Sequence, residues 1–457
     1  MKKLIYLSII PVLILLYGCP SKKINNGEVT GVTNRNPPFE TNPYAMVKIP
    51  MGSFVVGPND EDPTFAMNSQ SKTISVDAFW MDETEMTNSK YRDFVLYVTD
   101  SLKRKTLGET MPDEFLISED ANKNPIDPPF INWQTKIDLR DADVVTALEV
   151  LYLPENERFF RRKEIDTRKL IYSYQDINYQ EAAKAKRSFN RSIQSSDKSK
   201  TYYQDEDLAS DRSKFVKSYQ INVYPDTLCW ISDFTYSYND PMAKMYFWHP
   251  GFDAYPVVGV TWEQAQAFCV FRTQKMNNFL IQNKAGAVVQ NFRLPTEYEW
   301  EYAARGGRTL SMYPWGGPYS AFMKGHAAVG TNKSGFFANY KPLRGNYVAD
   351  GYLKPAPVGE YAANDYGLYD MAGNVAEWTS SAFDEDAYSF THDMNPNYEY
   401  SALPNESPVM KRKVVRGGSW KDVALYLQCG TRTYEYQDSA KSFIGFRCVR
   451  STMGIEK

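Results

Sequence analysis

Residues 367–378 read GLYDMAGNVAEW, and this stretch constrains the rest of the chain more than any other. It is too rich in Gly, Asp and Asn for an ordinary strand and too apolar for a solvated loop. Asp370 and Glu377 flank a turn that contains Gly373, and Trp378 follows directly. Carboxylates and main-chain carbonyls freed by a glycine turn are ligands that Ca²⁺ prefers. The alternative is a tight turn anchored by a buried tryptophan without an ion, since the spacing is not that of an EF-hand.

Five further motifs are spread along the chain on both sides of this turn. They read MVKIPMGSFVVG at 46–57, PVVGVTWEQAQAFC at 256–269, RLPTEYEWEYAARGG at 293–307, VVRGGSW at 414–420 and IGFRCVR at 444–450. Taken with the turn in chain order, they resemble the formylglycine-generating enzyme (FGE, or sulfatase-modifying factor) family. The resemblance covers most of the chain outside one large insertion. It implies an α+β class with the irregular FGE fold, which has C-type-lectin-like topology.

Length and composition set broad limits. At 457 residues the chain is long enough to bury a large core. Its net charge of −3 gives no reason to expect a nucleic-acid partner. Three scattered histidines argue against a histidine-based metal site, and 33 Tyr with 9 Trp favour a loop-rich fold held by aromatic rings.

The N-terminus has the pattern of a targeting segment. Lys2 and Lys3 precede an apolar run over 4–17, which is short for a membrane span and typical of a secretory signal. The residues before Cys19 resemble a bacterial lipobox, so residues 1–18 are predicted to be a lipoprotein signal peptide and Cys19 the lipidated residue. The alternative is a plain signal peptide or an uncleaved anchor.

Residues 19–43 are predicted to be the lipidated N-terminus and a flexible tether. The start of this tether lacks the acidic run that resembles a surface-export signal in Bacteroidetes lipoproteins. We therefore expect the chain to be lipid-anchored on the periplasmic face of an outer membrane.

A change in composition predicts an insertion into the FGE-like domain. Residues 109–250 contain no glycine, and apolar residues recur with helical spacing over 142–152 and 179–189. We therefore expect a large, mostly helical insertion, with the aromatic stretch 219–248 packing it back onto the main domain. The predicted boundaries are 44–98 for the first part of the FGE-like domain, 99–252 for the insertion and 253–457 for the second part.

Basic residues cluster within the insertion, where the sequence reads RFFRRK at 158–163. Arg158, Arg161, Arg162 and Lys163 either form a solvated face or dock a partner, and the sequence leaves both open.

Several local elements follow from capping and alternation. Residues 46–57 predict a strand pair, 74–81 predict further strand, and a helix is expected to start at Thr87 or Asn88. Capping boxes, in which side chain and backbone of two residues bond reciprocally, are predicted at Thr261/Gln264 and at Thr296/Glu299, with Gly306 ending the second helix.

Four cysteines remain once Cys19 is assigned to lipid: Cys229, Cys269, Cys429 and Cys448. An oxidising compartment allows three pairings, and four reduced thiols are the alternative. Resemblance to the FGE family favours a disulfide between Cys269 and Cys448.

The resemblance also implies structural Ca²⁺ sites. One ion in the family lies on the turn, which here implies the side chains of Asp370 and Glu377 with the carbonyls of Gly373 and Val375.

A second ion uses an asparagine with the next carbonyl and a later Asp-x-aromatic pair. Asn339, Tyr340, Asp350 and Tyr352 match this pattern, although the interval is shorter than in catalytic members.

Catalytic members of the family oxidise a substrate cysteine with O₂ and hold Cu(I) on two cysteines, because a soft monovalent ion selects thiolates. The matching positions here are Asp422 and Leu427, so the resemblance predicts no copper and no enzymatic activity. Asp422 is expected to bond backbone N–H groups of its turn. A residual oxidase using Cys429 is the alternative.

Signal, FGE-like domain and glycine-free insertion together resemble the GldK/PorK-type lipoproteins of gliding motility and type IX secretion. This resemblance implies a structural role in which many copies associate with each other and with a GldN/PorN-type periplasmic protein in a ring at the outer membrane. The alternative function is a lectin-like module that binds glycan or peptidoglycan.

Overall fold

The computed structural model describes residues 42–57, 71–120, 122–184, 215–233, 242–283, 288–321 and 335–452. The predicted signal peptide, the lipidation residue Cys19 and nearly all of the tether lie outside these ranges. Among the described helices, none combines the length and apolar character that crossing a bilayer requires.

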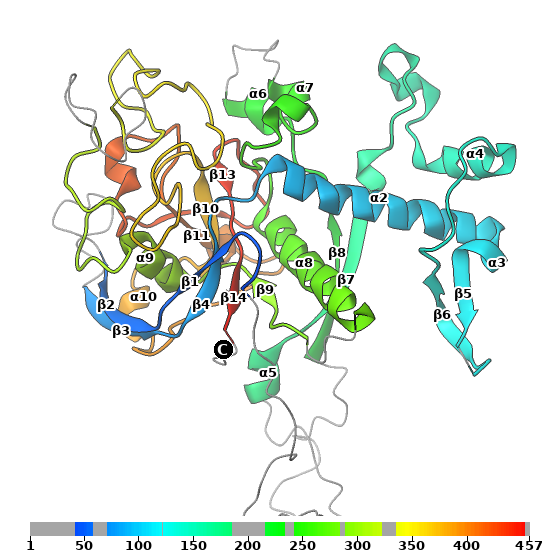
Figure 1. Cartoon of the computed structure of the whole chain (residues 1–457), viewed down its shortest axis with the longest axis horizontal. Helices are drawn as coiled ribbons and strands as arrows, with labels where there is room; N and C mark the ends of the chain where they lie inside the picture. The colour runs from blue at the N-terminus through cyan, green and yellow to red at the C-terminus, as the bar shows by residue number, and fades with distance from the viewer. Residues whose placement is uncertain are drawn as a thin grey trace, which may run out of the picture. The chain divides into compact units, whose positions relative to one another are not determined.

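The first sheet joins strands from the beginning, middle and end of the chain (Figure 1). Its order is β1-β4-β14-β9, and all its pairs are antiparallel. The strands are β1 (Met46–Ile49), β4 (Phe79–Asp82), β14 (Val449–Ser451) and β9 (Phe292–Arg293).

The predicted strand pair over 46–57 is wrong in its pairing. Strands form there, but β1 pairs with β4, whereas β2 (Gly52–Val56) pairs with β3 (Lys72–Val76) in a separate sheet. Only Pro50 and Met51 separate β1 from β2. A two-residue hairpin needs positive φ at its first central residue, and proline fixes φ near −65°. The chain therefore cannot turn back on itself here.

The second sheet has the order β12-β11-β10-β13, and the 367–378 turn leads directly into its inner strand β10. Every residue of β10 is buried, because neighbouring strands and α9 cover it. The strands are β10 (Ala376–Ala382), β11 (Arg412–Arg416), β12 (Thr433–Tyr436) and β13 (Ile444–Gly445).

Three long helices pack against these sheets: α2 (Asn88–Thr110), α8 (Trp262–Gln282) and α9 (Glu297–Arg305). The predicted starts are confirmed. The Thr87 side chain caps α2, and both predicted capping boxes are present at the starts of α8 and α9. Gly306 ends α9 at φ 60°, a conformation that favours glycine.

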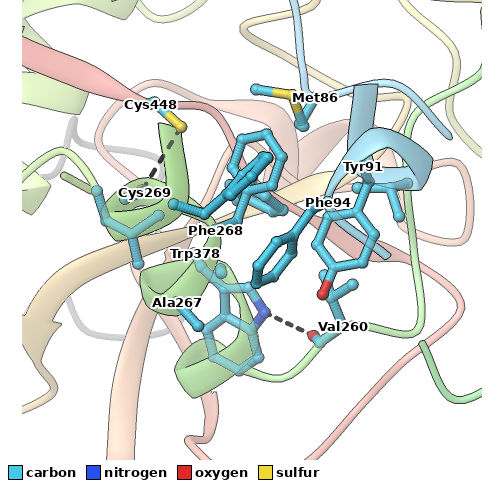
Figure 2. Packing of buried hydrophobic residues seen from close by; sticks show 14 of the residues in the cluster. Met86, Tyr91, Phe94, Val260, Ala267, Phe268, Cys269, Trp378 and Cys448 are labelled. Carbon is cyan, nitrogen blue, oxygen red and sulfur yellow. Dashed lines mark hydrogen bonds between the residues drawn. The ribbon is translucent and has the colours of Figure 1, made fainter. Parts of the chain in front are cut away.

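The main apolar cluster lies where α2 and α8 meet the second sheet (Figure 2). Tyr91 and Phe94 of α2 pack on Phe268 of α8, with ring centroids 5.6 and 5.9 Å apart. Trp378 of β10 is buried beside them and donates a hydrogen bond to the carbonyl of Val260 at 3.0 Å. The turn that precedes β10 is thereby fixed to the core.

The predicted insertion 99–252 is less helical than expected. Its described part contains two antiparallel strand pairs. One is the hairpin of β5 (Leu116–Glu119) with β6 (Pro125–Ile131), and in the other β7 (Ile171–Ile177) pairs with β8 (Val216–Asn222). In β7 the alternation of Tyr172 and Tyr174 with polar residues suits a strand that buries one face. The helices there are α3 (Pro112–Phe115), α4 (Ala142–Leu148), α5 (Tyr179–Lys184), α6 (Cys229–Asp233) and α7 (Met242–Met245).

Two expectations about this region are met as far as the structure describes it. Helical structure starts at both predicted places, although α5 ends at Lys184 and residues 185–189 lie outside the description. The aromatic stretch does pack on the main domain, since Val223 and Phe247 belong to the main cluster and Tyr246 packs beside Trp420. Helix α2 runs without interruption across the predicted boundary at residue 98.

Candidate functional site

The 367–378 turn adopts a backbone that few residues tolerate. Asp370, Gly373 and Asn374 have φ values of 55°, 79° and 58°. A Cβ on Gly373 would lie 2.3 Å from the carbonyl oxygen of Asn339, so this position requires glycine. The close approach lets the Asn374 N–H donate to that same carbonyl at 2.7 Å.

A buried ion pair holds the end of the turn. Arg447 donates to both Glu377 carboxylate oxygens at 2.6 to 2.9 Å, and Trp300 Nε1 donates to Glu377 Oε2 at 2.7 Å. Arg447 also donates to the carbonyls of Asp82 and Tyr369. The guanidinium therefore connects the segment between residues 445 and 449 with the turn and with β4 in the interior.

Glu85 is a member of this site that the sequence reading missed. Its carboxylate accepts hydrogen bonds from Asn374 Nδ2 at 3.2 Å and from Val375 N–H at 3.3 Å. Burial, and next the charge of Asp370, raises the pKa of Glu85 well above its usual range. Burial likewise raises the pKa of Asp370 to about 6, against a hydrogen bond from Gly359 N–H.

The charges of this site do not balance. Glu85, Asp370 and Glu377 are three buried carboxyl groups, whereas Arg447 is the one cation among the charged neighbours of Glu85 and Asp370. Buried negative charge without compensation is costly, so a proton or a cation is needed. No three acidic, His or Cys side chains in the described ranges converge on one point. An ion here would therefore take main-chain carbonyls as further ligands, as the predicted set with Gly373 and Val375 does.

The second predicted ligand set lies next to the first. Asn339 Nδ2 donates to Asn374 Oδ1 at 3.3 Å, so the two sets meet at the turn. Asp350 accepts hydrogen bonds from the N–H groups of Tyr340 at 3.0 Å and Tyr352 at 3.2 Å. Burial raises the pKa of Asp350 to about 6.

One atom of the second set is an unused acceptor. Asn339 Oδ1 is buried and has no hydrogen-bond partner among the described residues. A buried amide oxygen close to a buried carboxylate has the chemistry of a Ca²⁺ ligand pair. Asn339 and Asp350 therefore fit the ion that the family resemblance implies.

The two copper positions hold other side chains. Asp422 accepts hydrogen bonds from Ser419 N–H at 2.9 Å and Ser419 Oγ at 2.6 Å, which confirms the predicted turn contact. Leu427 is buried in an apolar cluster with Tyr313 and Tyr340. The two positions that hold thiolates in catalytic members therefore hold a carboxylate in a turn and an aliphatic side chain in the core.

Cys429 is buried beside charged residues. Burial, opposed by the charges of Arg305 and Arg416, raises the pKa of its thiol to about 12. A thiol with such a pKa is protonated at neutral pH and is a poor nucleophile and metal ligand.

Cys269 and Cys448 lie together in the core, as the predicted disulfide requires (Figure 2). Their sulfur atoms are 3.5 Å apart, in contact as two thiols, and burial raises the pKa of Cys269 well above its usual range. The disulfide itself stays a prediction.

The basic cluster at 158–163 lies away from this site and is partly neutralised. Arg158 pairs with Glu149 at 2.5 Å, and Lys163 pairs with the same carboxylate. Arg161 and Arg162 are exposed and form no ion pair with another described residue.

Comparison with known proteins agrees with the fold and the motifs. The family model described as "Sulfatase-modifying factor enzyme 1-like domain" (FGE-sulfatase) matches residues 32–150 and 173–452. These ranges cover most of the chain, and the chain belongs to this family.

The relatives include both active and inactive proteins. The formylglycine-generating enzyme of Bos taurus is 24% identical over 413 residues, which cover 89% of this chain and 75% of the relative. The inactive Cα-formylglycine-generating enzyme 2 of Bos taurus is 32% identical over 201 residues, or 43% of this chain and 50% of the relative. The chain thus spans half the length of this inactive relative.

Among solved structures, PvdO from Pseudomonas aeruginosa is similar with 16% identity and a TM-score of 0.41, over 89% of this chain and 94% of that chain. CarF is similar with 17% identity and a TM-score of 0.38, over 90% of this chain and 99% of that chain.

Proposed function

We propose that this chain is a non-catalytic, structural member of its family. In this proposal it is an outer-membrane lipoprotein of the GldK/PorK type, which forms a periplasmic ring with a GldN/PorN-type partner in the type IX secretion and gliding apparatus. The observation that carries the non-catalytic part is the pair Asp422 and Leu427 at the positions of the copper thiolates. Neither side chain binds Cu(I), and the remaining thiol of Cys429 is buried with a raised pKa.

The membrane anchor in this proposal is the lipid on Cys19, supported by the lipobox-like sequence before it. A single acyl chain binds membranes weakly, so many linked copies would hold the assembly firmly through avidity. A rigid domain with added surface suits repeated contacts of this kind.

Calcium is part of the proposal as a structural ion. Ca²⁺ would compensate the surplus negative charge of Glu85, Asp370 and Glu377 at the turn, and it would use the orphaned Asn339 Oδ1 beside Asp350. The ion would stiffen loops that form few of the hydrogen bonds that join strands in a sheet.

We expect Ca²⁺ to raise the thermal stability of the purified chain. A ligand present at about 100 times its Kd stabilises the folded state by about 3 kcal/mol. The measurement is the unfolding midpoint in EGTA and after addition of Ca²⁺, with Mg²⁺ as the control ion. The variant Asp350→Asn should lose part of the shift. Equal midpoints in EGTA and Ca²⁺ would count against structural calcium.

The test of the function is co-purification from the native organism. The tagged full-length chain, extracted in detergent, should carry a GldN/PorN-type protein in fixed stoichiometry, and electron microscopy should show rings. Retention on peptidoglycan or glycan with no such protein would instead favour the lectin-like module. If the chain were recovered in soluble form without an attached lipid, the proposed lipid anchor on Cys19 would be contradicted.

A further inference from the structure

Residues 341–349 form a loop that is closed at its base. The Asp350 carboxylate accepts a hydrogen bond from the Tyr340 N–H at 3.0 Å, so the residues on either side of the loop lie together. The Lys341 N–H donates to the carbonyl of Asp422 at 2.8 Å and ties the start of the loop to a neighbouring turn. The base of the loop is therefore held in place by hydrogen bonds.

The tip of this loop is exposed and largely apolar. Every residue of 343–348 (LRGNYV) is exposed, and we call this stretch the loop tip. The side chains of Leu343, Tyr347 and Val348 are 54%, 40% and 50% exposed. A β-turn shapes the tip, because the Asn346 N–H donates to the Leu343 carbonyl at 3.1 Å. The loop thus presents three apolar side chains at its far end, away from its closed base.

The exposed charge of the loop is positive. Arg344 is exposed at the tip, and Lys341 Nζ lies 4.4 Å from the centroid of the Tyr347 ring. The one acidic residue of the sequence 341–350 is Asp350, which is buried and accepts two main-chain hydrogen bonds. The described loop therefore combines exposed apolar side chains with cations, although the whole chain carries a net charge of −3.

We propose that the loop tip docks on an anionic lipid surface. Its apolar side chains would enter the boundary between headgroups and acyl chains, while Arg344 and Lys341 would stay at the level of the headgroups. Basic side chains next to an anionic membrane surface add to such binding. An acidic protein would also attract the cations, but six residues at the end of a loop offer much less area than a stable protein interface, which takes about 800 Å² per partner.

This contact deepens the proposed function, and it rests on that proposal only for a membrane close to the chain. A single acyl chain holds a protein to a membrane weakly, and stable binding takes a second signal. The predicted tether over residues 20–43 reaches about 80 Å at full extension, so the lipid on Cys19 alone would not orient the folded part. The loop tip would supply both the second signal and the orientation.

The test measures binding to vesicles in the absence of the lipid anchor. The chain is the predicted mature form, residues 19–457, with Cys19→Ser, and it keeps every described residue. The vesicles contain phosphatidylethanolamine with phosphatidylglycerol, and vesicles of phosphatidylcholine alone are the comparison without net charge. The apolar variant is Leu343→Ser with Val348→Ser, and the charge variant is Arg344→Glu.

Matched controls make the same changes at exposed positions elsewhere. Leu403→Ser with Val409→Ser alters two aliphatic side chains that are 59% and 54% exposed. Lys136→Glu reverses one exposed charge. The unfolding midpoint of every variant, followed by circular dichroism, should equal that of the parent chain, because none of the changed side chains is buried.

We expect the unlipidated chain to bind the anionic vesicles, and the apolar and charge variants to bind at least about tenfold more weakly. Both controls should bind like the parent chain. Binding should be weaker to phosphatidylcholine vesicles and at high salt, because the electrostatic attraction is then absent or screened.

A second measurement locates the loop tip in the lipidated chain itself. The native chain and its Tyr347→Trp variant are reconstituted in vesicles that contain phospholipids brominated near the headgroup. The variant should show additional tryptophan fluorescence that these lipids quench, because the new indole would lie within the headgroup boundary.

Three results would overturn this inference: an unlipidated chain that does not bind anionic vesicles, loop variants that bind like their controls, or a Tyr347→Trp variant without additional quenching. Loop variants that keep vesicle binding but lose a protein partner would assign the loop to that partner instead. A lipid-anchored, ring-forming chain whose loop tip does not bind vesicles would refute the inference and leave the proposed function intact. Vesicle binding through the loop tip by a chain that carries no lipid in its native organism would refute the proposed anchor and leave the inference intact.

Discussion

Replacement of Arg447 by methionine should lower the free energy of unfolding by about 3–5 kcal/mol, because removing one partner of a buried ion pair leaves the other charge uncompensated. Glu377 would lose its guanidinium, and the carbonyls of Asp82 and Tyr369 would lose a donor. Glu85, Asp370 and Glu377 would then stay buried without the guanidinium charge that Arg447 supplies to them. The measurement is urea-induced unfolding of Arg447→Met.

The control for this variant is Arg308→Met. Arg308 pairs with Asp365 at 2.6 Å, but both side chains are about half exposed. Such surface pairs contribute at most about 1 kcal/mol. The double variant Arg447→Met with Glu377→Gln should recover part of the loss, since Glu377 no longer leaves a buried charge without its partner. A cost for Arg447→Met no larger than that for Arg308→Met would contradict the structural importance of this ion pair.

Replacement of Lys413 by methionine should stabilise the chain at and below neutral pH. Lys413 is fully buried on β11, with its ammonium 3.6 Å from the ring centroid of Trp262 and donating to the carbonyl of Tyr400. The charges of Glu399 and Glu263 favour the protonated amine, but they offset the effect of burial only in part. Burial lowers the pKa of Lys413 to about 7.

The sign of the pH effect follows from this lowered pKa. The unfolded chain keeps Lys413 protonated up to about pH 10.5, whereas the folded chain releases the proton near pH 7. The unfolded state therefore binds more protons between these values, and stability rises with pH there. We expect the native chain to gain about 3 kcal/mol relative to Lys413→Met between pH 6 and pH 9.

Lys411→Met is the matched control, because Lys411 lies on the same segment and pairs with the exposed Asp438 at 3.0 Å. Its unfolding free energy should follow the native chain across the pH range. If the unfolding free energies of the native chain and of Lys413→Met changed in parallel with pH, the claim that Lys413 loses its proton in the folded chain would be refuted.

Local features of the fold could be predicted because their partners lie close in sequence. The capping boxes at Thr261 and Thr296 involve residues only three positions apart, and both are present. The pairing of β1 could not be predicted in the same way. Its partner β4 lies thirty residues further along, and only the geometry of Pro50 argues against the nearer strand.

The candidate site could also be predicted only in part, because some of its residues lie far apart in the sequence. Asp370, Glu377 and their neighbours lie within one motif, and the motif pointed to them. Glu85 reaches them from about 290 positions away and belongs to no motif that marks it as a ligand or a charge partner. Arg447 stood in a recognised motif, but only the structure shows that it occupies both oxygens of Glu377.

The basic cluster shows how side-chain pairing limits a prediction from charge alone. Four basic residues looked equivalent in the sequence, yet Glu149 neutralises two of them. Arg161 and Arg162 stay exposed, and only the structure separates them from the two paired residues.

The proposal that this chain is not an enzyme has one direct measurement. Purified chain is loaded with Cu(I) under reducing conditions, desalted, and assayed for retained copper and for oxygen uptake with a cysteine-containing peptide. The variant Asp422→Cys with Leu427→Cys, which places thiols at both copper positions, serves as the comparison for copper retention. The account predicts that the native chain retains no copper and consumes no oxygen with the peptide. Stoichiometric copper with peptide-dependent oxygen uptake by the native chain would contradict it.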